Sequence, residues 1–191
     1  MPRKPDPTLK PAIIEKVARH LLDTKLEDVS VRSLGRVLGT SAYPIVYHFG
    51  SREALIQAVV EHLSADVQAR SLEPAADADA LADHLVAVFG GLEDRERALA
   101  ARLSFELGSV ESLDGRDHES RCHRRRVAEL AAWCRAHGRC PDEAERAARA
   151  MVEAARGAQW GALVDPEHTD VDAALRALAH DLTTGARLTA A

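Results

Sequence analysis

The stretch Gly39–Ser51, "GTSAYPIVYHFGS", holds two tyrosines, a histidine and a phenylalanine within the seven residues from Tyr43 to Phe49. Phe, Trp and Tyr together make up only 4% of the chain, so this concentration of rings is unusual. A glycine stands at each end of the cluster, and glycine readily adopts the left-handed backbone that ends a helix. The pattern predicts a short helix that carries several rings between two turns.

Helix signals surround this short segment on both sides. Hydroxyl side chains cap helix N-termini, and glycine often ends helices. Ser30, Ser41 and Ser51 each precede a helical pattern, while Gly39 and Gly50 each follow one. In the first 63 residues we expect helices at Leu9–Asp23, at Val31–Leu38, between Ser41 and Gly50, and from Arg52 to Leu63.

The rest of the chain also reads as helix. Apolar residues recur at three- and four-residue spacing, β-branched residues are few, and no alternating run persists. The sequence therefore predicts an all-α protein of about nine helices. The further expected helices are Ala78–Leu92, Arg95–Leu107, His118–His137, Pro141–Val164 and Asp170–Leu188.

A helix, a turn built on Gly39 and a second short helix form a helix-turn-helix, whose second helix enters the DNA major groove. The stretch Val29–Val60 resembles the tetracycline-repressor (TetR) family of bacterial transcription regulators. This resemblance implies a DNA-binding domain at residues 1–63 and a ligand-binding and dimerisation domain at residues 64–191. The positions that match the family pattern are Ser30, Arg32, Leu34, Gly39, Ser41, Tyr47, His48, Phe49, Arg52 and Leu55.

The same resemblance assigns DNA contacts in residues 1–63, which we call the head. Arg32 is placed to bind guanine with two hydrogen bonds, while Thr40, Tyr47, His48 and Arg52 are candidates for phosphate contacts. Arg3, Lys4 and Lys10 are expected to form a basic arm along the DNA backbone. The full set of expected DNA-binding residues is Lys10, Ser30, Arg32, Thr40, Ser41, Ala42, Tyr43, Pro44, Tyr47, His48 and Arg52.

Two positions depart from the family pattern. Val46 stands where a phosphate-contacting tyrosine is common, and Tyr43-Pro44 replaces smaller residues. Tyr43 either reaches the same backbone or reads a base edge. Phe49 is expected to close the core beneath the helices of the head. Because long donors are few, readout should depend on thymine methyl groups, close fit and DNA shape.

Charge is distributed unevenly along the chain. The net charge is −5, but residues 1–63 carry nine Lys/Arg and seven Asp/Glu, whereas residues 64–191 carry 16 and 23. The positive excess therefore lies in the head, which agrees with an anionic partner. The three cysteines form no CxxC pair, and no apolar run is long enough to cross a bilayer. The N-terminal residues do not resemble a signal peptide, so we expect a cytoplasmic protein without a membrane partner.

The resemblance implies a homodimer formed by the last two helices. Small residues line one side of Pro141–Val164, and Gly157 and Gly161 would each cost about 1 kcal/mol inside a helix unless they allow close packing. The alternative is that this stripe packs only within one chain. The residues expected at the interface are Ala150, Ala154, Gly157, Trp160, Gly161, Leu175, Leu178 and Leu182.

The resemblance also implies a small-molecule site in residues 64–191, which we call the body. Such sites combine large apolar walls with a few polar anchors, although each of these residues could equally belong to the core. The candidates are His84, Phe89, Arg102, Phe105, Glu106, Trp133 and Gln159.

Other chemistries find little support. His118 and Cys122 lie four residues apart with His123 adjacent, a spacing that holds two ligands of a metal site, but further ligands are not evident and arginines follow. No nucleophile, base and acid set or phosphate loop occurs, so we expect no enzyme, no metal and no cofactor. The predicted function is a dimeric repressor that binds a palindromic operator and is released by a small-molecule effector. The alternatives are a helix-turn-helix regulator that acts through a protein partner or a metal, and a head that binds another protein.

Overall fold

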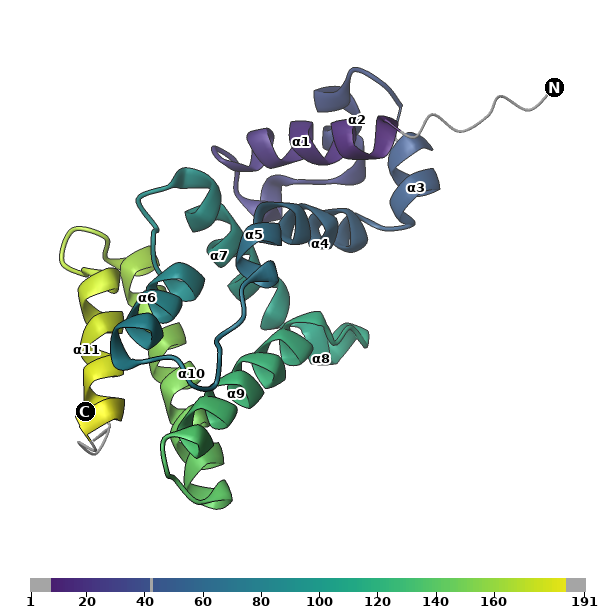
Figure 1. Cartoon of the computed structure of the whole chain (residues 1–191). Helices are drawn as coiled ribbons and strands as arrows, with labels where there is room; N and C mark the ends of the chain where they lie inside the picture. Colours follow the sequence, from purple (N-terminus) through teal and green to yellow (C-terminus); the bar gives the residue numbers. More distant parts are fainter. Residues whose placement is uncertain (1–7, 42, 185–191) are drawn as a thin grey trace. The chain divides into compact units, whose positions relative to one another are not determined.

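The structure is a computed structural model that describes residues 8–41 and 43–184 (Figure 1). These residues form eleven α-helices and one 3-10 helix, and they contain no strand. The all-α class is confirmed. The two helices beyond the expected nine are short: α5 (Ala65–Ala69) and α8 (Glu111–Asp114). Arg3, Lys4, Ala42 and the end of the helix expected to reach Leu188 lie outside the described residues.

The chain divides into two compact units. The first comprises Met1–Ala65 and Arg95–Leu107, and the second comprises Asp66–Asp94 and Gly108–Ala191. The expected division after residue 63 left Arg95–Leu107 in the body, whereas the structure places this segment in the first unit. The reason is that Leu99, Leu103 and Leu107 join the apolar core of that unit.

The first unit packs its helices around one buried apolar cluster. Val17, Leu21, Leu34, Ile45 and Leu55 are completely buried in it. Each comes from the inward stripe of an amphipathic segment, so helix periodicity sets the fold of this unit. Its elements are α1 (Leu9–Leu21), η1 (Leu26–Asp28), α2 (Val31–Leu38), α3 (Tyr43–Phe49), α4 (Arg52–Leu63) and most of α7 (Arg95–Gly108).

The predicted caps fix the ends of the short helices. The Ser30 hydroxyl accepts a hydrogen bond from Ser33 N at 3.0 Å, and the Ser51 hydroxyl accepts one from Ala54 N at 3.0 Å. Gly39 and Gly50 have φ angles of 70° and 78°, in the left-handed region that suits glycine. The turns on both sides of α3 are therefore confirmed.

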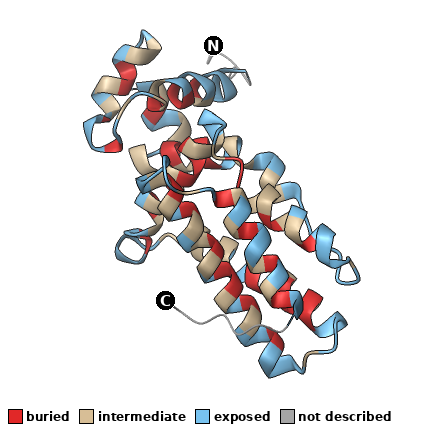
Figure 2. Cartoon of the chain, turned by 90° about the vertical axis from the view of Figure 1, so that its left-hand side faces the viewer, coloured by how far each residue is buried: buried red, intermediate tan, exposed pale blue. Residues whose placement is uncertain are grey.

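The second unit is a bundle of longer helices. Helix α10 packs against α9 and α11, and α11 also packs against α6. Buried residues occupy the inward faces of these helices (Figure 2). The four helices are α6 (Ala78–Phe89), α9 (His118–Ala136), α10 (Pro141–Val164) and α11 (Val171–Thr184).

A buried charged cluster links α9 to α5 and to the residue that follows α5. Arg126 donates to Val67 O at 2.8 Å and to Arg70 O at 3.2 Å, and its Nη1 lies 2.9 Å from Glu129 Oε2. His84 of α6 places Nε2 4.0 Å from the same carboxylate oxygen, and its side chain is 8% exposed. Burial, followed by the nearby Arg126 and Arg70 charges, lowers the pKa of His84 more than Glu129 raises it.

His84 should therefore make the stability of the protein depend on pH. Because its folded pKa lies below the ordinary value of 6.5, the unfolded chain takes up a proton first as the pH falls through that value. We expect the free energy of unfolding to decrease between pH 7.5 and pH 5, and His84→Gln to reduce this decrease. Urea unfolding at several pH values measures it. His180→Gln, at an exposed position of the same unit, is the matched control. An unchanged pH dependence in His84→Gln would contradict the assignment.

Candidate functional site

Helix α3 turns most of its surface outward. Ile45 is its only residue buried within the described part of the chain, and Phe49 is half-buried against the core of the first unit. By contrast, Tyr43, Val46 and Tyr47 are 69%, 52% and 60% exposed. Clusters of exposed large apolar and aromatic side chains often mark a binding surface. We call these three residues the α3 outer face.

The two tyrosines of the α3 outer face lie one helical turn apart on the same side. Their rings stack with centroids 5.7 Å apart at an angle of 24°, and Tyr47 meets the His48 ring edge-on at 5.0 Å. Val46 is three residues from Tyr43, so helix geometry places it beside Tyr43 on the outward side of α3. This surface offers two phenol hydroxyls and one branched apolar side chain.

Basic and hydroxyl groups belong to the elements around α3. The Lys10 ammonium of α1 lies 5.3 Å from the Phe49 ring centroid. In the turn before α3, Thr40 and Ser41 are exposed, and Ser41 Oγ accepts a hydrogen bond from Tyr43 N at 3.4 Å. Pro44 is half-buried in the first turn of α3.

Helix α2 contributes two exposed arginines. Arg32 and Arg36 are four residues apart, so they project from one side of the helix. Ser30, also expected to bind DNA, uses its hydroxyl in a reciprocal cap with Ser33. Sequence reasoning named Arg32 and missed Arg36, although the four-residue spacing of two arginines was visible in the sequence.

Arg52 is used inside the unit rather than on its surface. Its Nε donates to Val29 O at 2.5 Å, its Nη2 donates to Leu26 O, and its Nη1 lies 3.2 Å from Glu53 Oε1. The side chain is 23% exposed. This arrangement differs from the expectation that Arg52 contacts phosphate, because its donors are directed at the carbonyls of the segment that leads into α2.

Removing these bonds should destabilise the first unit. Arg52→Met keeps much of the aliphatic length and leaves two carbonyls without their charged donor, so we expect the free energy of unfolding to fall by about 2 kcal/mol. Arg36→Met removes the same charge from an exposed position and should change it by less than about 0.5 kcal/mol. Chemical denaturation compares the two. Equal stability of both variants would show that the Arg52 bonds contribute nothing to the fold.

The seven residues expected to bind a ligand fall in both units. Arg102, Phe105 and Glu106 lie on α7 in the first unit, where Arg102 donates to Leu21 O at 2.8 Å. The other four belong to the second unit. There Gln159 donates to Phe89 O at 3.0 Å, which brings these two residues together.

Two of the second-unit candidates also belong to its apolar core. Phe89 and Trp133 are 5% and 3% exposed, and Trp133 Nε1 donates to Ala76 O at 2.8 Å. His84 belongs to the cluster with Arg126. Among the described residues these contacts give each of the four a structural role.

Some of the residues expected at a dimer interface are buried in the core of the second unit, and others are exposed on its surface. Leu175 and Leu182 are buried at 0% and 4% exposure in the core of the second unit. Ala150, Ala154, Gly161 and Leu178 are half-buried. Gly157 and Trp160 are exposed, Trp160 by 53%, and Val164 on the same side of α10 is 63% exposed. We call Gly157, Trp160, Gly161 and Val164 the α10 outer face.

Within residues 8–41 and 43–184, no close contact requires a glycine at position 157. A Cβ atom built at Gly157 would meet no atom within 4 Å, whereas one at Gly90 would lie 2.1 Å from Asp172 Oδ1. Gly90 is thus explained by a close approach inside the unit. A glycine in the middle of α10 with open space around it lacks such an explanation.

The residues weighed as metal ligands form only a pair. Cys122 Sγ lies 3.5 Å from His118 Nε2, and within residues 8–41 and 43–184 no group of three or more potential ligands occurs. Burial, followed by the Glu119 charge, raises the pKa of the Cys122 thiol. A thiol that holds its proton is a poor metal ligand.

None of the helices in the described ranges has the length and apolar character required to cross a bilayer. No protein-family model matches the sequence, and no curated protein matches it. Solved structures do match. The chain is similar to a transcriptional regulator from Rhodococcus sp. Rha1, with 18% identity and a TM-score of 0.74 over 95% of this chain and 100% of that chain.

A second solved structure, named as a TetR-family transcriptional regulator from Rhodococcus sp., matches with 18% identity and a TM-score of 0.65 over 92% of this chain and 96% of that chain. At this identity the likeness establishes the fold. The resemblance drawn from Val29–Val60 is thus confirmed at the level of the fold, which the chain shares with these regulators over nearly its whole length.

Proposed function

We propose that this chain is a transcription regulator of the TetR family that binds duplex DNA through the α3 outer face. The observation that carries the proposal is the exposure of Tyr43, Val46 and Tyr47 on the second helix of a helix-turn-helix. The two similar structures, both named as transcriptional regulators, support it. A regulator that must reach DNA in a bacterium would act in the cytoplasm, by binding rather than by catalysis.

In this proposal α3 enters the major groove. The phenol hydroxyls of Tyr43 and Tyr47 bind phosphate oxygens or base edges, and Val46 contacts thymine methyl groups. Arg32, which lies on α2, binds a guanine. Arg36 on the same side of α2 adds positive charge. Lys10, Thr40 and His48 supply further backbone contacts.

Substitutions on this surface should weaken DNA binding. A duplex selected from a random-sequence pool by the wild-type protein provides the probe. Arg32→Ala should cost about 1–3 kcal/mol of binding free energy, or about 5- to 150-fold in Kd, because a guanine contact is lost. Tyr47→Ala should weaken binding to most sequences. Fluorescence anisotropy at several salt concentrations measures both.

The matched control is Arg135→Ala, which removes the same charge from an exposed position of α9 in the second unit. Its affinity should equal that of the wild type. If Arg32→Ala and Arg135→Ala bound the selected duplex equally, the assignment of the DNA surface would be wrong. If the wild-type protein enriched no duplex, DNA binding itself would be refuted.

We further propose that two copies associate through the α10 outer face. Trp160 and Val164 are exposed there, and Gly157 leaves room for the close approach of another helix. Twofold symmetry would present two α3 helices to successive major grooves about 34–36 Å apart, so the operator would be palindromic.

A large side chain at Gly157 should separate the copies. We expect Gly157→Leu to shift the protein from dimer to monomer in sedimentation velocity experiments. The free energy of unfolding of the monomer should not decrease, because leucine favours helix more than glycine does. Ala136→Leu, at an exposed position on α9, is the control and should remain dimeric. A wild-type protein that sediments as a monomer at micromolar concentration would contradict this interface.

For regulation we propose that a small molecule bound by the second unit releases the DNA, which makes the protein a repressor. A ligand that binds better to the conformation unable to hold DNA shifts the population toward it. The alternative is a helix-turn-helix regulator without such an effector, which acts through a protein partner. Thermal-shift screening of a metabolite panel, followed by release of the selected duplex, distinguishes the two.

A further inference from the structure

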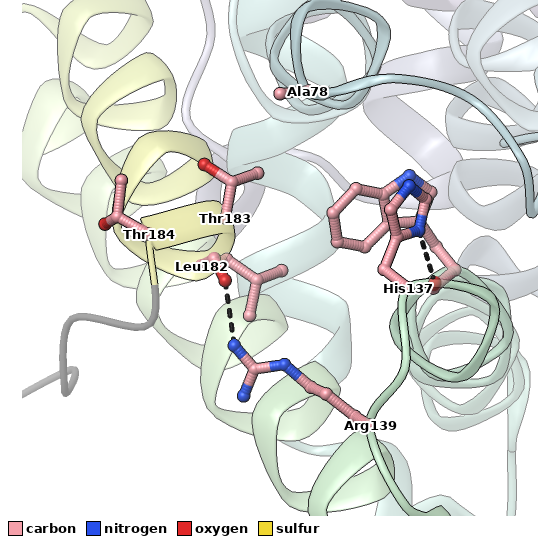
Figure 3. A pocket seen from close by; sticks show the side chains of 7 residues that line it. Ala78, His137, Arg139, Leu182, Thr183 and Thr184 are labelled. Atoms are coloured by element: carbon pink, nitrogen blue, oxygen red, sulfur yellow. Dashed lines mark hydrogen bonds between the residues drawn. The ribbon is translucent and has the colours of Figure 1, made fainter.

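A cavity of about 390 Å³ lies in the second unit, near the C-terminal ends of α9 and α11 (Figure 3). Its volume is within the range of sites for small organic ligands. Of the residues that sequence reasoning selected for a ligand, only Trp133 lines it. The lining residues are Ala78, Trp133, His137, Arg139, Leu182, Thr183 and Thr184.

Arg139 supplies a cation that is held in place. Gly138, at a φ of 87°, follows α9 and turns the chain so that Arg139 reaches the end of α11. There Arg139 Nη2 donates to Leu182 O at 2.8 Å (Figure 3). A guanidinium carries five N–H donors in a plane, so this bond orients the group and leaves donors for a carboxylate. Fixing the arginine in advance also lowers the entropy cost of binding an anion.

Trp133 and His137 form an aromatic wall. Their rings stack with centroids 3.9 Å apart at an angle of 21°. His137 Nδ1 lies 2.9 Å from Trp133 O, so Nδ1 carries the hydrogen and the other ring nitrogen is an acceptor when the ring is neutral. His137 is exposed, while its stacking partner is held in the core. A stacked pair fixed in this way favours a flat ring in the cavity.

The end of α11 adds hydroxyl oxygens. The Thr183 hydroxyl donates to His180 O at 2.7 Å, and the Thr184 hydroxyl donates to the same carbonyl at 3.0 Å. Each hydroxyl thereby uses its only hydrogen and keeps oxygen lone pairs that can accept a hydrogen bond from a ligand. Cation, aromatic wall and acceptors therefore line one cavity.

We propose that this cavity binds a small aromatic carboxylate that carries a hydroxyl group. The carboxylate pairs with Arg139, the ring packs against the His137–Trp133 stack, and the ligand hydroxyl donates to Thr183. The aromatic wall favours such a compound over inorganic phosphate, which would use only the arginine. This inference names a ligand class for the second unit and so rests on the effector part of the proposed function. Because the binding is measured without DNA, its failure leaves the proposed DNA-binding surface untouched.

The test is isothermal titration of the full chain with 4-hydroxybenzoate as the probe. For a ligand of this size we expect a Kd of about 0.1–1 mM. Benzamide lacks the charge and cyclohexanecarboxylate lacks the flat ring, and each should bind at least about tenfold more weakly. Absence of binding by 4-hydroxybenzoate at about 10 mM, or equal binding of all three compounds, would overturn the proposal.

Variants locate the binding in this cavity. Arg139→Gln should weaken binding at least about tenfold, while Arg135→Gln, which removes the same charge from exposed α9 surface, should leave it unchanged. Because Arg139 also caps α11, Thr183→Val provides a second variant with nearly the same volume. It should weaken 4-hydroxybenzoate and leave benzoate unchanged, a difference that loss of folding would not produce. Equal binding by Arg139→Gln and Arg135→Gln, or by wild type and Thr183→Val, would place the site elsewhere.

Discussion

The presentation of α3 depends on the burial of Ile45, its only residue buried within the described ranges. A helix of seven residues is too short to be stable alone, so tertiary contacts must hold it. Ile45 at 0% exposure and the half-buried Phe49 provide those contacts, while the glycine turns on both sides define the ends of the helix. With its inner side fixed in this way, α3 can present two tyrosines and a valine outward without losing its position.

The rest of the first unit supports the same helix. Arg52 binds one carbonyl of η1 and one of Val29, which follows it, and the reciprocal Ser30–Ser33 cap fixes the start of α2. The leucines of α7 complete the core beneath them. In the second unit, by contrast, α10 leaves an exposed tryptophan and a glycine with open space around it. The α3 and α10 outer faces, which carry the exposed aromatic side chains Tyr43, Tyr47 and Trp160, are those proposed to meet partners.

Much of the fold followed from the sequence, because local signals set it. The bounds of α2, α4 and α10 agree with serine caps, glycine stops and proline positions. The internal role of Arg52 could not be predicted, since its acceptor Leu26 O is 26 residues away and a basic residue beside Ser51 suits a phosphate equally well. The helical periodicity of apolar residues predicts that a helix buries one face. It does not show whether that face packs within the chain or against a second copy. Leu175 and Leu182 therefore looked like interface residues and lie in the core of the second unit.

The central claim is that the α3 outer face meets DNA, and the composition of the chain offers a direct test. The protein has only two tyrosines, Tyr43 and Tyr47, and both lie on this face. Fluorine NMR of protein labelled with 3-fluorotyrosine therefore reports on α3 alone. When the duplex selected by the wild-type protein is added, we predict that both resonances shift or broaden and that high salt reverses the change. A stable complex in which both resonances keep their free positions would contradict the account.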